Sequence, residues 1–348
     1  MRFLLINSIL VFLLLSCNSN PSLDAGNKTD KTTDTSSTNE NAVSYAVAIH
    51  GGAGSQSRES ISTETDQAVR RALNAALDAA ESVLKKNGVA GDAVIAAIEI
   101  LENDPNFNAG KGAVFTHEER NELDASFMDG KMMDAGAVGG VTNIKNPIKA
   151  ARAVMEDSPH VLLTGKGAEE FAKSKNIEIV DPSYFKVQSR LDAVRRAKEE
   201  MKVKKHGTVG CVVRDIHGNL AAGTSTGGMT NKRWNRIGDS PIIGAGTYAN
   251  NNSCAVSSTG HGEFFIRYAV AHDISALMEY KGMSVEEASN HVINEKLKEA
   301  GGAGGVVCVD KDGNISTSFN TKGMYRGYAT SKSRGVAIYK DEKLMMPN

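Results

Sequence analysis

The 348-residue sequence lacks several features on which common functions depend. Its formal net charge is only −1, so it has no positive surplus with which to bind nucleic acid or an anionic membrane surface. Aromatic residues make up 5%, which leaves few rings for stacking on bases. No C-x-x-C pair occurs among Cys17, Cys211, Cys254 and Cys308, which excludes a zinc ribbon or a thioredoxin-type site. The last three lie in apolar runs, where we expect reduced, structural cysteines.

The sequence also lacks an apolar run long enough to span a membrane. The mostly apolar stretch 3–15 is far shorter than the ~20 residues that a spanning helix needs. It follows Met1-Arg2 and precedes Leu-Leu-Ser-Cys17, so residues 1–16 are typical of a secretory signal. The position of Cys17 resembles a bacterial lipobox, in which the cysteine is lipidated. The alternative is an ordinary signal with a coincidental cysteine. We expect an exported lipoprotein on the periplasmic or cell-surface side, held to the membrane only by this lipid.

Residues 17–44 are rich in Ser, Thr, Asn, Asp and Lys, with almost nothing to bury, which predicts a disordered tether. The whole chain is 41% hydrophobic and 23% charged, which is near the ordinary range of globular proteins, so a folded core is expected. The folded part therefore begins near Tyr45 and is long enough for one large domain or two small ones.

Periodicity predicts a mixed α+β fold. A strand over 45–49 ends in a glycine-rich turn, 50–54, and the hairpins 208–214/220–226 and 304–309/315–319 follow later. Helices are predicted over 66–86, 92–101 (with Asp92 as its cap), 147–155, 167–173, 191–205, 263–281 and 284–299. This order favours antiparallel sheet layered with helices over a doubly wound parallel sheet.

The most informative point is the segment His206-Gly-Thr-Val-Gly210, where a charged stretch runs directly into a strand that begins with Thr208. A threonine hydroxyl is a weak nucleophile without a base. At a chain N-terminus its own α-amino group, with an unperturbed pKa of ~7.7–8.0, can be that base. Cleavage between Gly207 and Thr208 would therefore switch activity on. Gly207 has no side chain to shield its carbonyl group or restrict its backbone. Alone, the segment is more typical of an ordinary strand start that follows a glycine.

Further motifs follow in a fixed order, and together they carry a resemblance. They are His50-Gly-Gly-Ala-Gly54, Phe107-Asn-Ala-Gly-Lys-Gly-Ala-Val-Phe115, Glu122-Leu-Asp-Ala-Ser126, Gly207-Thr-Val-Gly210, Thr224-Ser-Thr-Gly-Gly228, Arg236-Ile-Gly-Asp-Ser-Pro241, Gly244-Ala-Gly246 and Thr259-Gly-His-Gly-Glu263. From Tyr45 onward the chain resembles the plant-type L-asparaginase/isoaspartyl peptidase family of N-terminal-nucleophile hydrolases.

The resemblance implies a fold and a subunit division. The fold would be a four-layer αββα sandwich of two antiparallel sheets. Residues 45–207 would form an α subunit, with about 190–207 as the processing linker, and 208–348 a β subunit. The two would assemble as a dimer of αβ units, with a small molecule or dipeptide as substrate and no cofactor for catalysis.

The resemblance also implies roles for individual residues. Thr208 would be the nucleophile, Thr226 its hydrogen-bonding partner, and Thr259 with Gly260 the oxyanion hole. Asn108 would support the site. A second group of residues would bind the substrate's α-carboxylate and α-ammonium: Arg236, Ile237, Gly238, Asp239 and Gly262. Backbone carbonyls of a loop would bind a structural sodium ion: Leu101, Glu102, Asp104, Phe107, Ala109 and Lys111.

Two positions depart from the family pattern. Cys211 stands where relatives usually have alanine. Asn235 stands where glycine often precedes the arginine, although asparagine tolerates the left-handed conformation that such a turn requires. Neither changes the class. Of the nearby histidines, His50 is expected to be structural and His206 to belong to the linker. His261 lies inside the oxyanion motif, and a role and no role are equally expected for it.

Other interpretations remain open. Gly223-Thr-Ser-Thr-Gly227 matches G-x-S-x-G, which would make Ser225 the nucleophile of an α/β-hydrolase with His50-Gly-Gly as its oxyanion strand. The chain could also be a catalytically silent binding lipoprotein on this fold. Within the family, a glycosylasparaginase is a further alternative, but that branch usually has Asp before the nucleophile. We expect β-aspartyl dipeptides to be preferred, with L-asparagine as a side activity, and L-aspartate as product.

Overall fold

The computed structural model describes residues 44–200 and 207–344. The predicted signal, Cys17, nearly all of the tether, and His206 with the end of the processing linker lie outside these residues. No helix between the described ends of the chain is both long and apolar enough to cross a membrane.

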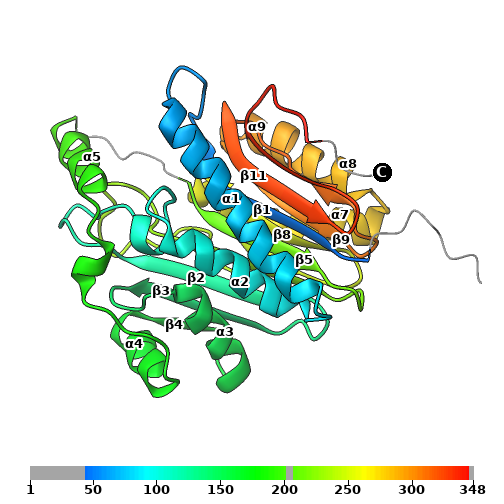
Figure 1. Cartoon of the computed structure of the whole chain (residues 1–348), viewed down its shortest axis with the longest axis horizontal. Coiled ribbons are helices and arrows are strands. Elements are labelled where there is room, and N and C mark those ends of the chain that lie inside the picture. Colours follow the sequence, from blue (N-terminus) through cyan, green and yellow to red (C-terminus); the bar gives the residue numbers. More distant parts are fainter. Residues whose placement is uncertain (1–43, 201–206, 345–348) are drawn as a thin grey trace, which may run out of the picture. The chain divides into compact units, whose positions relative to one another are not determined.

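An eight-stranded sheet forms the centre of the fold (Figure 1). Its neighbouring strands are antiparallel except for one parallel pair, β3 and β4. In spatial order the strands are β12 (Arg334–Tyr339), β11 (Gly323–Thr330), β1 (Ala46–Gly54), β5 (Val209–Arg214), β6 (Leu220–Thr226), β2 (Leu123–Asp129), β3 (Ala135–Val141) and β4 (Leu162–Thr164).

A second, four-stranded antiparallel sheet packs against one face of the first. Its order is β10 (Ile315–Ser316), β9 (Gly304–Asp310), β8 (Cys254–Gly260) and β7 (Thr247–Ala249). Small and branched apolar side chains fill the space between the sheets, among them Val212, Ala222, Ala255 and Val307. Cys211, Cys254 and Cys308 are free and buried, as predicted.

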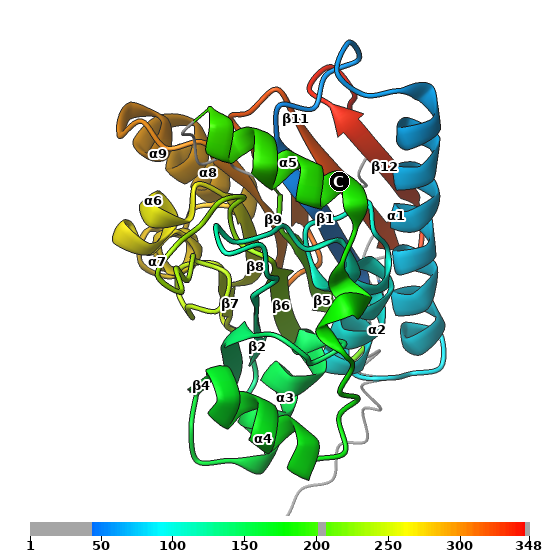
Figure 2. The same cartoon turned by 90° about the vertical axis from the view of Figure 1, so that its left-hand side faces the viewer.

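Helices cover both outer faces, so the predicted four-layer αββα sandwich is confirmed (Figure 2). The eight-stranded sheet is covered by α1 (Thr63–Leu84), α2 (Ala90–Asn103), α3 (Pro147–Asp157) and α4 (Gly165–Ser174). The four-stranded sheet is covered by α6 (Gly262–Arg267), α7 (Val270–Lys281), α8 (Val285–Asn290), a π-helical turn (His291–Lys296) and α9 (Leu297–Glu299). Three further elements precede β5 in the chain: helix α5 (Gln188–Glu199) and the 3-10 turns Gly110–Gly112 and Pro182–Phe185.

Several local predictions were wrong. Segment 50–54 is not a turn, because β1 continues through it and pairs with β11 as far as Gly54. A bulge between His50 and Gly52 bends the strand there, and Gly52 has φ +115°, which glycine alone adopts readily. The single helix predicted over 263–281 is two helices, because Ala269 between them has φ +47°.

Asp92 does not cap α2. The helix begins at Ala90, and its cap, Val89, offers no side-chain hydrogen bond. The carboxylate of Asp215, from the turn after β5, instead accepts the Ala90 N–H at 3.0 Å. Asp92 lies in the first turn, where a negative charge favours the helix dipole. The capping group thus comes from a distant part of the chain.

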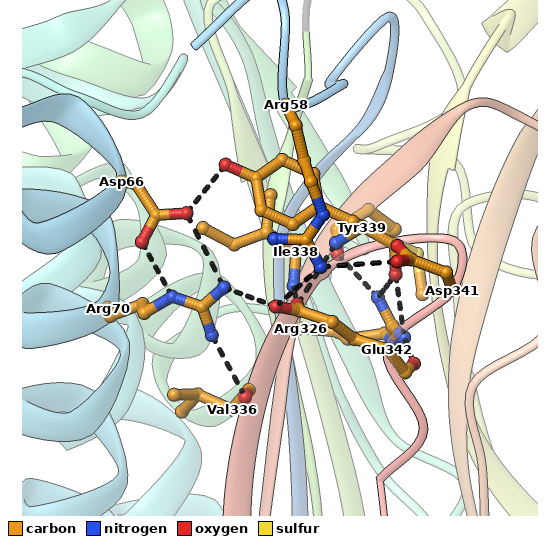
Figure 3. A network of polar contacts seen from close by, with 10 residues as sticks. Arg58, Asp66, Arg70, Arg326, Val336, Ile338, Tyr339, Asp341 and Glu342 are labelled. Carbon is orange, nitrogen blue, oxygen red and sulfur yellow. Dashed lines mark hydrogen bonds and ion pairs between the residues drawn. The ribbon is translucent and has the colours of Figure 1, made fainter. Parts of the chain in front are cut away.

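A polar network joins α1 to the end of the chain (Figure 3). Arg70 contacts Asp66 at 2.7 Å and Glu342 at 2.6 Å, and the Tyr339 hydroxyl donates to Asp66 at 2.6 Å. Buried Arg326 donates to the backbone carbonyls of Tyr339 and Glu342. The network therefore ties residues before position 207 to residues after it.

Candidate active site

The β5–β6 hairpin brings Thr208 and Thr226 together. Val209 pairs with Ser225, so Thr208, immediately before β5, stands opposite Thr226 at the end of β6. The Thr208 hydroxyl donates to the Thr226 Oγ1 at 3.1 Å. Thr226 Oγ1 also accepts the Gly228 N–H at 3.0 Å. Two donors thus fix the Thr226 oxygen beside the hydroxyl that is predicted to be nucleophilic.

Strand β8 of the other sheet supplies Thr259 and Gly260. Thr259 Oγ1 accepts the backbone N–H of Thr208 and that of Ala53, both at 3.2 Å. Gly260 has φ +148°, and a Cβ there would lie 2.4 Å from the Ala303 carbonyl oxygen, so the position needs glycine. Thr259 therefore lies beside the Gly207–Thr208 bond, and Gly260 is the next residue in the chain.

Gly207 packs against the bulge of β1. A Cβ on Gly207 would lie 2.5 Å from the Gly52 Cα, and one on Gly52 would lie 2.4 Å from the Gly207 Cα. No side chain fits at either position without movement of the backbone. The close approach explains why a glycine precedes Thr208, and it shows that the glycine-rich part of β1 serves the site.

His50 holds the backbone of the predicted nucleophile. Its Nδ1–H donates to the Thr208 carbonyl oxygen at 2.9 Å, and its Nε2 accepts from the Ser257 hydroxyl at 2.9 Å. The carbonyl can only accept, which determines the tautomer. Complete burial lowers the pKa of His50 to about 4, so the ring is neutral at physiological pH. His50 is structural, as expected, but its structural role is at Thr208.

The predicted substrate-binding residues converge in a second group. A Cβ on Gly262 would lie 2.7 Å from Asp239 Oδ1 and 2.8 Å from Arg236 Nη2, and one on Gly238 would lie 2.6 Å from Arg236 Nη1. Ile237 packs over Gly139 of β3. Asn235 adopts φ +53°, so asparagine does tolerate the left-handed turn before Arg236.

Asp239 is a buried carboxyl group without a hydrogen-bond partner for its Oδ2 among the described residues. Burial raises its pKa to about 7, against the attraction of Arg236. Arg236 does not form an ion pair with it but contacts Glu263 through Nε at 2.9 Å. The result is a desolvated carboxyl group next to a guanidinium whose two Nη groups face the same space, which suits a ligand that carries both charges.

Asn108 acts at one remove from Thr208. Its Nδ2 donates to the Gly228 carbonyl at 2.7 Å, and its Oδ1 accepts the Val114 N–H at 2.9 Å. Its backbone carbonyl accepts the Gly227 N–H at 3.2 Å. Asn108 thus holds the turn whose Gly228 N–H is bonded to Thr226.

A buried charged cluster beneath the site was not identified from the sequence. Lys232 is nearly inaccessible, and its Nζ lies 3.1 Å from the Glu122 carbonyl oxygen, 3.7 Å from Glu122 Oε2 and 4.0 Å from Asp124 Oδ2. Asp124 pairs across the sheet with Thr226. Burial raises the pKa of Asp124, while Lys232 and the Gly140 N–H oppose that rise. The motif Glu122-Leu-Asp-Ala-Ser126 was the signal, but a motif alone does not say which side chains turn inward.

Ser225 cannot be the nucleophile. Neighbouring strand residues face opposite sides of a sheet, so Ser225 faces the helices while Thr226 faces the other sheet. Its hydroxyl is fully buried and donates to the Glu102 carboxylate at 2.6 Å. His50, the other member of that interpretation, is bonded to Thr208 and Ser257 instead.

The loop predicted to bind sodium begins in the last turn of α2, which contains Leu101 and Glu102, and leads to the 3-10 turn Gly110–Gly112. A Cβ on Gly110 would lie 2.3 Å from the Glu102 carbonyl oxygen, and one on Gly112 would lie 2.0 Å from that of Phe107. The carbonyls of Leu101, Asp104 and Ala109 accept N–H groups of the same loop. The Lys111 ammonium lies over the Tyr184 ring. Within 44–200 and 207–344 no group of three or more His, Cys, Asp and Glu side chains is arranged to hold a metal ion.

Two largely antiparallel sheets lie between helical layers, and a threonine immediately before a central strand faces a second threonine. This arrangement is that of the N-terminal-nucleophile class of hydrolases. A family model described as asparaginase matches residues 43–338, and the chain belongs to this family.

Individual relatives cover nearly the same length. The chain is 51% identical over 321 residues to a putative isoaspartyl peptidase/L-asparaginase of Dictyostelium discoideum, with 81% of this chain and 92% of that protein covered. It is 49% identical over 310 residues to the isoaspartyl peptidase of Escherichia coli K12, covering 85% and 96%. The mouse isoaspartyl peptidase/L-asparaginase is 41% identical over 288 residues, covering 81% and 87%.

Proposed function

We propose that the chain cleaves itself between Gly207 and Thr208 and then hydrolyses isoaspartyl dipeptides and L-asparagine, releasing L-aspartate. The observation that carries this proposal is the geometry of Thr208. Its hydroxyl donates to Thr226 at 3.1 Å, and its backbone nitrogen lies 3.2 Å from Thr259 Oγ1. The relatives' names supply the substrates.

Self-cleavage uses the Thr208 hydroxyl against the preceding peptide bond. Oγ1 attacks the Gly207 carbonyl carbon, the C–N bond to Thr208 breaks, and the nitrogen takes up a proton as an amine. Water then hydrolyses the resulting ester, leaving a carboxylate on Gly207 and a free Thr208. The packing of Gly207 on Gly52 leaves no side chain to shield this carbonyl.

Substrate hydrolysis repeats these bond changes on a free ligand. The new α-amino group accepts the hydroxyl proton, and Oγ1 attacks the side-chain carbonyl of the aspartyl residue. Thr259 Oγ1–H and the Gly260 N–H donate to the oxygen as it becomes negative. The leaving amine or ammonia departs with a proton, and water hydrolyses the ester to release aspartate.

Binding of the free amino-acid end distinguishes this substrate class from ordinary peptides. The two Nη groups of Arg236 can bind the α-carboxylate side by side while Glu263 keeps Nε in place. Asp239, with the Gly262 carbonyl, binds the α-ammonium. Ile237 and Gly238 connect these two charged residues in the chain, so the spacing of the charges is built into one short segment.

The two fragments would remain one molecule after cleavage. Residues 45–207 would be the α subunit and 208–348 the β subunit. Three strand pairs (β1–β11, β1–β5 and β2–β6) join them within one sheet, and the network of Figure 3 adds ionic contacts. Each pair is a row of backbone hydrogen bonds that cleavage of one peptide bond leaves intact.

We further propose, from the sequence, a bound ion, a lipid anchor and a dimer. The loop from Leu101 to Lys111 would bind sodium through backbone carbonyls, which the crowding of carbonyl oxygens around Gly110 and Gly112 supports. Cys17 would carry the lipid of an exported, membrane-tethered lipoprotein. The αβ units would pair as dimers. Thermal stability in sodium against lithium, mass analysis of the membrane fraction and sedimentation would test these in turn.

The decisive experiment is intact mass spectrometry of the chain from Tyr45, with Thr208→Ala as the control. Two fragments that meet between Gly207 and Thr208, absent from the control, together with aspartate release from β-aspartyl-leucine and L-asparagine, would support the proposal. An uncut chain or a cut chain inactive on both substrates would contradict it.

A further inference from the structure

A cavity of about 260 Å³ has Gly207 in its wall. Gly51, Gln56, Asn106, Arg190, Gly207 and Tyr325 are among the residues that line it. Gly207 is bonded to Thr208, so the cavity begins one residue from the predicted nucleophile. A leaving group must depart from beside the Thr208 nitrogen, and this nitrogen is bonded to Gly207 of the cavity wall. Its volume is below the ~300 Å³ at which ordinary small-molecule sites begin, and suits one amino-acid residue.

Arg190 is a cation without a counter-ion in this cavity. Its Nη2 donates to the Asn106 carbonyl at 2.9 Å, and no carboxylate among the described residues lies within ion-pair distance of it. Burial lowers its pKa, against the influence of Tyr325. A desolvated guanidinium that keeps most of its donors free is costly in the empty protein, and a bound anion compensates that cost.

Arg190 is also held in place independently of the cleaved bond. It lies in the first turn of α5, where the neighbouring Leu191 and Val194 are buried against Phe115. Further along the same helix, Arg195 and Lys198 form ion pairs with Glu119 at 3.0 Å and 2.9 Å. These contacts keep the guanidinium at the cavity after Gly207 is freed.

Gln56 is a second group in the cavity that awaits a partner. Its Nε2 donates to the Gly52 carbonyl at 3.4 Å, while its Oε1 is buried and has no hydrogen-bond partner in the described parts of the chain. A free acceptor beside an unpaired cation matches a ligand that carries an N–H group and a carboxylate.

We propose that, once Gly207 withdraws, this cavity receives the leaving residue of an isoaspartyl dipeptide and that Arg190 binds its α-carboxylate. The inference rests on the proposed function and deepens it. L-Asparagine releases ammonia, which has no carboxylate, so Arg190 is the residue that makes the site favour dipeptides. The new carboxylate of Gly207 has the same chemistry and is the competing occupant.

The test compares three substrates on the cleaved enzyme: β-aspartyl-leucine, its C-terminal amide and L-asparagine. The wild type is expected to prefer the acid to the amide by about 10- to 100-fold in kcat/KM, the loss expected for one charge-assisted hydrogen-bonded pair. Arg190→Gln removes that preference, and its kcat/KM on L-asparagine falls far less than on the acid. Arg195→Gln, five residues along the same helix and engaged with Glu119, is the matched control and keeps the preference.

Equal rates of the wild type on acid and amide would overturn the proposal without any variant. So would an Arg190→Gln enzyme that keeps the preference, which would assign Arg190 to the Gly207 carboxylate, or one that loses all three activities equally. If Arg190→Gln does not fold, Arg190→Lys is expected to keep a reduced preference. Inactivity of the cleaved wild type on all three substrates would instead contradict the proposed function.

Discussion

Replacing Asp239 with asparagine should stabilise the protein while it destroys activity. The Asp239 carboxylate is buried, its Oδ2 has no hydrogen-bond partner in the part of the chain that the structure describes, and Arg236 is engaged with Glu263. Folding therefore removes the charge of this carboxylate from water, and few interactions in the folded protein compensate the free energy of desolvation. Asparagine has the same shape and no charge, so it escapes this cost. It also loses the charge that would bind the substrate's α-ammonium.

The size and the pH dependence of the effect follow from the pKa. A rise from 3.8 to about 7 corresponds to roughly 4 kcal/mol of destabilisation in the ionised form. Because the folded state holds its proton up to about pH 7, while the unfolded chain loses it near 3.8, this cost appears as pH rises between those values. The gain in unfolding free energy from Asp239→Asn should be about 4 kcal/mol at pH 8 and about 1 kcal/mol at pH 4.5.

Urea unfolding measures this best in a Thr208→Ala background, where one uncut chain unfolds. Asp239→Asn is compared with its parent at pH 4.5 and pH 8, so that the titration of all other groups cancels. In the cleavable chain, kcat/KM for L-asparagine should fall by at least about 100-fold, because the substrate's ammonium would be buried without a partner. Equal stability of the two proteins at pH 8, or a gain that does not change with pH, would refute the reasoning.

Three further changes test other parts of the site. Thr226→Val removes the oxygen beside the Thr208 hydroxyl and should slow both cleavage and hydrolysis roughly 100-fold, with Thr226→Ser close to wild type in mass and rate assays. Ser225→Ala removes one donor from the buried Glu102 carboxylate, whose pKa is already raised to about 7 by burial, and leaves it those of Asn146 and Ile148. Unfolding free energy should fall by about 1–3 kcal/mol at pH 8 while activity stays, and loss of activity would restore the serine-nucleophile interpretation. His50→Ala should cost about 1–3 kcal/mol and slow cleavage, whereas a His50 that titrates near pH 6.5 by NMR would contradict its neutral, buried state.

Some strands of the eight-stranded sheet could be predicted from the sequence, and others could not. The β5–β6 hairpin was found because Val209–Arg214 and Leu220–Thr226 flank a clear turn. Strand β3, whose sequence is Ala-Gly-Ala-Val-Gly-Gly-Val, carries no such signal. It is a strand because it pairs with β2 and β4, and it needs glycine because α3 packs on it so closely that a Cβ on Gly136 would lie 2.1 Å from the Ala151 carbonyl oxygen. Such small residues record a close approach of distant segments, which local periodicity does not contain.

The candidate site divides in the same way. The sequence by itself determined which residue types are available and, through ordered motifs, the fold class and the family. Strand alternation then made Thr226 and Ser225 face opposite sides. Only the tertiary structure decided which groups meet: Thr259 at the Thr208 nitrogen, His50 at its carbonyl, Glu263 rather than Asp239 on Arg236. Burial is a property of the packed layers, so the shifted pKa values of Asp239 and His50 and the unpaired charge of Arg190 could be found only there.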